Sequence, residues 1–83
     1  MFIRSPKELA LICVVRRKKL RLSQAEIAMR VGLKQKTISA FENKPEGTQI
    51  TTLFLILSAL NLDVNVLLKG EAVVGEHQWS EGW

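Results

Sequence analysis

The stretch that most constrains the fold runs from Ser23 to Asn43 and has the sequence SQAEIAMRVGLKQKTISAFEN. Ser23 can cap a helix, and Glu26, three residues later, completes a capping box, so a short helix should begin there. We expect Gly32 to end that helix, at a turn that needs a positive φ angle. A second helix follows from Gln35, and the turn between the two helices fixes the angle at which they meet.

The apolar residues of this stretch are spaced to fill the wedge between the two helices. A small residue, Ala28, lies where the helices must approach closely. The five wedge residues are Ile27, Val31, Leu33, Ile38 and Phe41. This pattern is typical of a helix-turn-helix, whose second helix lies in the major groove of DNA. A helical hairpin that only packs could share the pattern by chance.

The second helix begins with unusual chemistry. Lys34 occupies the cap position, where Ser, Thr, Asp or Asn is favoured, and Lys36 adds another cation at the positive end of the helix dipole. Against DNA these lysines would gain guanine and phosphate acceptors, Gln35 could pair with adenine, and Ser39 lies one turn further along the same face. The alternative is that these side chains are merely solvated, which does not explain why the two preceding helices are capped well.

The remaining helices are predicted from similar signals. Ser5, Pro6 and Glu8 form a strong helix start, and this first helix should run to about Lys19. Residues 44–47 should break the recognition helix, expected at about 34–43. A fourth helix should begin between 49 and 52 and end near 60–61. Its broad apolar face, which predicts a core helix, consists of Ile50, Leu53, Phe54, Ile56, Leu57 and Leu60.

After the fourth helix the period of the sequence changes. Leu62, Val64, Val66 and Leu68 alternate with other residues, which predicts a strand over 62–69 with one apolar face. A lone strand has no partner for its backbone groups, so we expect it to pair with its equivalent in a two-fold dimer. The expected organisation is a DNA-binding domain over 1–61, a dimerising strand over 62–69 and a flexible tail over 70–83.

Charge is distributed unevenly along the chain, and the composition gives no sign of a disulfide-bonded, secreted or membrane protein. Residues 1–47 hold eleven Lys/Arg and four Asp/Glu, whereas residues 48–83 hold one Lys and four acids, so a basic front half precedes an acidic tail. A single cysteine cannot form an intramolecular disulfide, and Cys13 lies in an apolar helical run, so we expect a buried, inert thiol there. Neither a membrane span nor a signal peptide is expected, which favours the cytoplasm, close to the nucleoid.

No arrangement of residues typical of catalysis is present, so an enzyme is not expected. His77 is the one histidine of the chain, and it lies beside Glu76 in the tail, where a solvated side chain is the simplest interpretation. There is no CxxC pair and no glycine loop that could hold phosphate. We therefore expect no cofactor and no metal.

The segments SPKELA, KQKTISAFEN and TTLFLILSALNL, with a C-terminus ending in Trp, resemble the lambda-repressor-like (Cro/C1-type, XRE) helix-turn-helix family and within it the HipB-like antitoxins. The resemblance implies a mainly α fold of four helices whose C-terminal β-strand pairs across a homodimer. It also implies an antitoxin that binds palindromic operators in double-stranded DNA and represses its own operon. The implied protein partner is a HipA-like serine/threonine kinase toxin, either a single chain or split into two.

The resemblance also assigns roles by position. Lys34 and Gln35 would read bases, Gln24 would anchor a phosphate, and Arg17 would support the site. The other implied contacts with DNA are those of Lys36, Thr37, Ser39, Ala40 and Asn43. The final Trp83, with Trp79 nearby, would dock on the kinase. Arg16 departs from the family pattern, because that position of the first helix is usually apolar.

Two alternatives belong to other functional classes. One is a phage-type or other toxin–antitoxin repressor without a kinase partner, which would have no need of an acidic tail ending in Trp. The other is an interaction module whose helix-turn-helix no longer binds DNA, against which the presence of Gln24, Lys34 and Gln35 argues. Trp79 and Trp83 could also pack back on the domain, but the glycines around them favour a tail that orders on binding.

Overall fold

The computed structural model of the chain describes residues 2–70. Within them lie α1 (Pro6–Lys19), α2 (Gln24–Val31), α3 (Gln35–Asn43), the 3-10 helix η1 (Pro45–Gly47) and α4 (Ile50–Ala59). These bounds agree with the helices expected from the sequence. The predicted break after α3 contains η1, in which Pro45 is the first residue and is buried.

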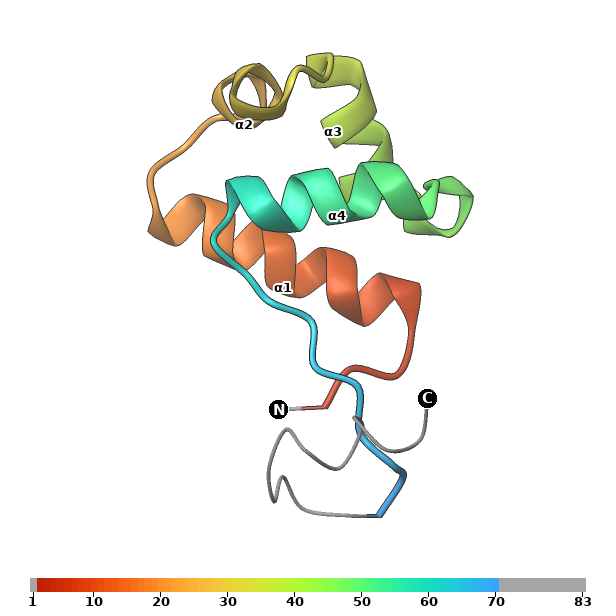
Figure 1. Ribbon diagram of the computed structural model, residues 1–83. Coiled ribbons are helices and arrows are strands. Elements are labelled where there is room, and N and C mark those ends of the chain that lie inside the picture. Colours follow the sequence, from red (N-terminus) through yellow and green to blue (C-terminus); the bar gives the residue numbers. More distant parts are fainter. Residues whose placement is uncertain (1, 71–83) are drawn as a thin grey trace.

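The two helices of the turn motif lie at one end of the molecule, above α1 and α4 (Figure 1). Helix α2 packs against α3 and α4, whereas α1 packs against α3 and η1. The side chains that these helices enclose completely are those of Phe41, Ile27, Ile38, Ile56, Leu60 and Cys13. The predicted wedge is confirmed, since Ile27, Ile38 and Phe41 are buried and Val31 and Leu33 pack at the edge of this core.

Two helix starts are held by serine caps, as the sequence predicts. The Ser5 hydroxyl accepts a hydrogen bond from the Glu8 N–H at 3.1 Å. At α2, the Ser23 hydroxyl accepts from the Glu26 N–H at 3.0 Å, and the Glu26 carboxylate accepts from the Ser23 N–H at 2.8 Å. Each cap satisfies a donor that the helix itself leaves without a partner, which stabilises the start by about 1 kcal/mol.

The apolar face predicted for α4 is wider than the part that the core covers. Ile56, Leu57 and Leu60 are buried, but Ile50 and Phe54 are 70% and 54% exposed. The expectation that this whole face lies in the core is therefore wrong for these two side chains. The reason is that α2 covers one side of α4, and no other element within residues 2–70 packs closely along the opposite side.

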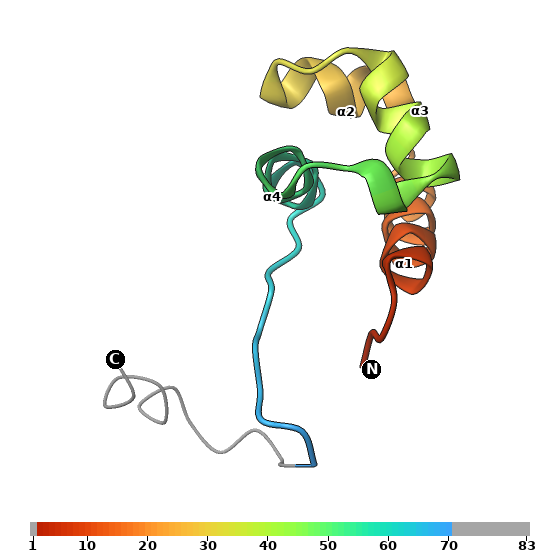
Figure 2. The same cartoon turned by 90° about the vertical axis from the view of Figure 1, so that its right-hand side faces the viewer.

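The segment after α4 runs away from the helices in both views (Figures 1 and 2). Leu62 packs against the core of its own chain, while the side chains of Val64, Val66 and Leu68 are all more than half exposed. No strand is assigned within residues 2–70. A strand requires a backbone partner, so the pairing expected over 62–69 stays a prediction about two copies. Trp79, His77 and Trp83 lie outside the described residues.

The lone cysteine lies inside the core. Cys13 is 1% exposed, and burial raises the pKa of its thiol to about 11, with a smaller contribution from the negative charge of Glu42. The thiolate is the reactive form of cysteine, so this side chain is a packing residue at neutral pH. The expectation of a buried, inert thiol is confirmed.

The chain leaves α1 through a turn in which one residue has the left-handed backbone conformation. Arg21 has a φ of 59°, and its N–H donates to the Lys18 carbonyl at 3.0 Å, while the Leu22 N–H donates to the Arg17 carbonyl at 3.1 Å. This pair of hydrogen bonds forms a Schellman motif, whose left-handed position favours glycine or asparagine. Arginine there crowds its Cβ against the backbone, so the fold carries local strain at this turn.

We expect Arg21→Gly to raise the free energy of unfolding by about 1 kcal/mol, because glycine adopts the left-handed conformation without strain. Urea unfolding followed by circular dichroism would measure the change. A matched control is Arg30→Gly in α2, an exposed position with helical backbone, where glycine should instead lower stability by about 1 kcal/mol. Equal destabilisation by both substitutions would contradict the argument from strain.

Candidate nucleic-acid interface

The turn between α2 and α3 depends on the backbone of Gly32. Its φ is 70°, and the next N–H, of Leu33, donates to the Ala28 carbonyl at 2.9 Å. A Cβ built on Gly32 would meet nothing within 4 Å. Glycine is therefore needed here for its conformation and not for space, and the turn sets the direction in which α3 leaves.

The first turn of α3 presents positive charge that no cap neutralises. Lys34 is the N-cap residue, and its side chain makes no capping hydrogen bond. Lys34, Gln35 and Lys36 are all exposed. The N–H groups at this helix start and the two ammonium groups together make a site suited to an anion. The prediction that this helix, unlike α1 and α2, lacks a side-chain cap is confirmed.

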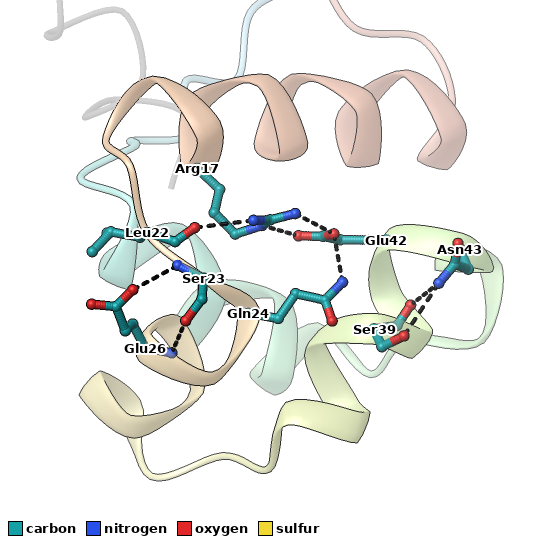
Figure 3. Close-up of polar contacts among 8 residues, drawn as sticks. All are labelled: Arg17, Leu22, Ser23, Gln24, Glu26, Ser39, Glu42 and Asn43. Atoms are coloured by element: carbon teal, nitrogen blue, oxygen red, sulfur yellow. Dashed lines mark hydrogen bonds and ion pairs between the residues drawn. The ribbon is translucent and has the colours of Figure 1, made fainter.

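The remaining predicted contacts follow one side of α3. Ala40 and Asn43 are exposed, whereas Thr37 and Ser39 are half-buried. The Asn43 amide nitrogen donates to the Ser39 carbonyl at 2.8 Å and to the Ser39 hydroxyl at 3.2 Å (Figure 3). A contact between DNA and the Asn43 N–H groups would therefore compete with bonds already made within the helix, whereas the Ser39 hydroxyl accepts here and keeps its own proton to donate.

A second set of side chains joins α3 to α1 and α2. The Arg17 guanidinium donates to both carboxylate oxygens of Glu42, from Nε at 2.7 Å and from Nη2 at 3.0 Å. The Gln24 amide nitrogen donates to the same carboxylate at 2.9 Å, as Figure 3 shows. Glu42 thus binds a residue from the end of α1 and the first residue of α2, and these contacts fix the orientation of α3.

Arg17 occupies a supporting position in this set. Its Nη1 donates to the Leu22 carbonyl at 3.0 Å, in addition to the two bonds with Glu42. All three nitrogens of the guanidinium are therefore engaged inside the protein. The predicted role of Arg17 as a support for the site fits this geometry better than direct contact with a ligand does.

The ion pair is shielded from water. The side chains of Arg17 and Glu42 are 13% and 9% exposed, so solvent screens their attraction only weakly. Burial alone would raise the pKa of Glu42, but the hydrogen bonds from Arg17 and Gln24 and the charges of Arg17 and Lys18 outweigh it. The pKa of Glu42 therefore lies below its ordinary value, and the carboxylate stays ionised at neutral pH.

Glu42 is a residue of the site that sequence reasoning missed. It lies between Phe41, in the core, and Asn43, on the exposed side, so its position on the helix indicates partial burial. A partly buried carboxylate needs a partner, but nothing local identifies one. Its partner Arg17 is 25 positions away along the chain and is one of four basic residues in the last turn of α1.

Other chemistries find no support in the described part of the chain. No group of three or more His, Cys, Asp or Glu side chains is placed there to hold a metal ion. Among the helices of residues 2–70, none has the length and apolarity that crossing a membrane requires. The described geometry therefore offers one candidate site, the exposed side of α3 with the start of α2.

We expect Glu42→Gln to lower the free energy of unfolding by about 2 kcal/mol at pH 7, because the partly buried Arg17 charge loses its partner. Since folding lowers the pKa of Glu42, the ionised carboxylate stabilises the wild type fully above its ordinary pKa of 4.5, and this contribution is lost progressively as the pH falls from there through the lower pKa of the folded state. Urea unfolding at pH 7 and pH 3 would measure the difference between the two proteins.

The matched control for this substitution is Glu46→Gln, an exposed carboxylate in η1 that should change stability by less than about 0.5 kcal/mol at either pH. The difference in the free energy of unfolding between wild type and Glu42→Gln should be smaller at pH 3 than at pH 7. An unchanged difference at the two pH values would contradict the ionic account of this contact.

Comparison with known proteins gives consistent results. A helix-turn-helix family model (HTH_3) matches residues 16–67, from the end of α1 to the segment after α4. The antitoxin HipB of Escherichia coli is 42% identical over 64 residues, which cover 77% of this chain and 73% of that protein. The antitoxin HigA1 of Mycobacterium tuberculosis is 38% identical over 53 residues, which cover 64% of this chain and 36% of that protein.

Solved structures give the same relationship. A chain from a structure described as a HipA-HipB-O2-O3 complex superposes with a TM-score of 0.81 at 39% identity, covering 83% of this chain and 97% of that chain. A chain from a HipB-O4 20mer complex gives a TM-score of 0.80 at 39% identity, again over 83% and 97%. The similarity thus extends over nearly the whole length of these neighbours.

Proposed function

Because this chain belongs to the helix-turn-helix family and is a homologue of the HipB antitoxins, we propose that it is a sequence-specific DNA-binding antitoxin that acts as a dimer. It represses its own operon and neutralises a HipA-like serine/threonine kinase toxin, and it has no catalytic activity of its own. The observation that carries the DNA-binding part is the uncapped, cationic first turn of α3, held in place by the contacts of Glu42.

In this proposal α3 enters the major groove with its first turn leading. Lys34 and Gln35 contact base edges, because a lysine can donate to guanine acceptors and a glutamine amide can pair with adenine. Lys36 neutralises a phosphate, and the start of α2 at Gln24 meets the backbone of the same half-site. The lysine at the cap position of α3 then has a purpose, since its charge attracts the phosphates, which neither a neutral serine cap nor an aspartate cap would do.

Rigid placement of α3 supports specificity. A helix that reads bases must hold its side chains at a fixed depth in the groove, and flexibility would add an entropic cost to binding. The hydrogen bonds of Glu42 to Arg17 and Gln24 tie α3 to both other helices near the DNA. These bonds support the proposal, because they join the start of α2, proposed to contact phosphate, and α3, proposed to contact bases, in one rigid unit.

A second copy of the chain would cover the exposed apolar surface near the end of α4. Val64, Val66 and Leu68 are exposed, and a groove of about 400 Å³ runs beside them between Phe54 and Val64. Pairing of residues 62–69 between two copies would bury these side chains and satisfy their backbone groups. Leu62 would anchor the segment on its own core. A two-fold dimer presents two recognition helices related by symmetry, which matches the two half-sites of a palindromic operator.

The partner proposed for the antitoxin activity is a HipA-like kinase, as one chain or as two. A structural neighbour of this chain is described as a complex of HipB with HipA, which supports such an assembly here. We assign the docking role to Trp83, assisted by Trp79, because tryptophan is an effective anchor at protein interfaces. Both residues belong to the part of the chain outside the described structure.

A repressor without a kinase partner is the second candidate. The observation behind it is the similarity to HigA1, an antitoxin that is not named as a HipB. That similarity covers a shorter part of this chain than the similarity to HipB does, and it takes in only about a third of HigA1. The kinase-directed antitoxin is therefore the better supported of the two.

We expect Lys34→Ala to weaken binding to DNA from upstream of this gene by about 1–3 kcal/mol and to reduce the preference for that DNA over other sequences, because Lys34 contacts base edges. Fluorescence anisotropy over a salt series, with a scrambled duplex for comparison, would measure both. Lys69→Ala removes a charge outside the helices and should change the affinity little. Equally tight and steeply salt-dependent binding of wild type to both duplexes would instead favour an interaction module with a merely basic surface.

We expect Trp83→Ala to weaken binding to the HipA-like kinase of the same operon by at least about 2 kcal/mol, as is typical of an interface anchor. Titration calorimetry would give the affinity, and a kinase assay would report the loss of inhibition. Binding to DNA should stay at the wild-type level and serves as the control for folding. Unchanged affinity for the kinase would remove the docking role from Trp83.

A further inference from the structure

Arg16 makes the one hydrogen bond, among residues 2–70, that joins α1 to the end of α4. Its Nε donates to the main-chain carbonyl of Leu60 at 3.0 Å, across 44 positions of sequence. Leu60 is the C-cap residue of α4 and is buried, and the Arg16 side chain is itself partly buried. This contact therefore lies at the point where the chain leaves the helices.

The last carbonyl groups of α4 accept hydrogen bonds from the backbone that follows the helix and from a side chain of α1. The Asn61 N–H donates to the Ser58 carbonyl at 3.1 Å, and the Leu62 N–H donates to the Leu57 carbonyl at 2.9 Å. Arg16 adds a charged donor to a third carbonyl at this helix end, that of Leu60. A guanidinium at the negative end of a helix dipole is favourable, and a charge-assisted hydrogen bond is stronger than a neutral one.

The direction of the segment 62–69 is decided at this place. Asn61 has a φ of 57°, which turns the chain out of α4, and the segment then runs away from the helices (Figure 2). An extended segment of this length reaches about 25 Å, since each residue adds about 3.3 Å. A small change of angle at Leu60 therefore becomes a displacement of several ångströms at the far end.

Two neighbouring arginines of α1 thus hold two different elements. Arg17 binds Glu42 of α3, and Arg16 binds the base of the segment 62–69. We propose that Arg16 is a positioning residue that sets the angle of this segment and thereby the distance between the two recognition helices of the dimer. The half-site spacing that the protein accepts in DNA is then controlled from α1. This inference rests on the proposed function as a dimeric DNA-binding protein.

The test compares wild type with Arg16→Met, which keeps an unbranched side chain but removes the donor and the charge. The probe is the palindromic duplex that wild type selects from a random library, together with versions whose centre is one or two base pairs longer or shorter. A duplex with a single half-site completes the set. Anisotropy at one salt concentration gives each affinity, and gel filtration with light scattering checks that both proteins form dimers.

Wild type should lose at least about tenfold in affinity for each base pair of wrong spacing, because a rigid dimer cannot follow the displaced half-site. In Arg16→Met this penalty should fall to about threefold or less, while affinity for the single half-site stays within about twofold of wild type. The charge control is Arg4→Met, an exposed arginine before α1, which should keep the wild-type spacing profile.

An Arg16→Met profile that matches wild type, or a uniform loss on every duplex including the single half-site, would overturn the proposal. If Arg16→Met does not fold, Arg16→Gln decides the matter by the same profile, because its shorter side chain cannot span the same distance. Failure of wild type to select any duplex would instead count against the proposed function itself.

Discussion

The arrangement of the DNA-binding surface depends on the ion pair between Arg17 and Glu42. Helix α3 is short and begins without a cap, so little within its own sequence holds it in place. Its orientation comes from the core on one side and from this carboxylate on the other. A buried pair gains little net stability over an apolar contact, but it allows only one geometry, because the bidentate bond fails when the helices shift.

This constraint explains how opposite demands on α3 are met. The first turn carries cations that weaken the isolated helix, and the last turn carries the carboxylate that anchors it. The charges are therefore segregated along the helix, with the proposed surface for DNA at one end and the structural contact at the other. Gln24 links the two, since it starts α2 beside the proposed phosphate site and also binds Glu42.

Local signals allowed the helices to be predicted from the sequence. Contacts between residues far apart in the chain could not be predicted in this way. The serine caps, Pro6 and Gly32 act within a few residues, so they fixed the helix bounds and the turn. The exposure of Ile50 and Phe54 depends on how much of α4 its neighbours cover, which periodicity does not report. The pairing of Arg17 with Glu42 and the bond from Arg16 to Leu60 join distant parts of the chain, and a strand over 62–69 involves a second molecule altogether.

The exposed segment after α4 would make repression depend steeply on the concentration of the protein. Val64, Val66 and Leu68 are more than half exposed within residues 2–70, and in the proposed dimer a second copy covers them. Where monomers predominate, the population of dimers grows with the square of protein concentration, and so does the occupancy of a palindromic site. Repression built on such a segment would rise sharply over a narrow range of expression, and a modest fall in the amount of antitoxin would release the operon.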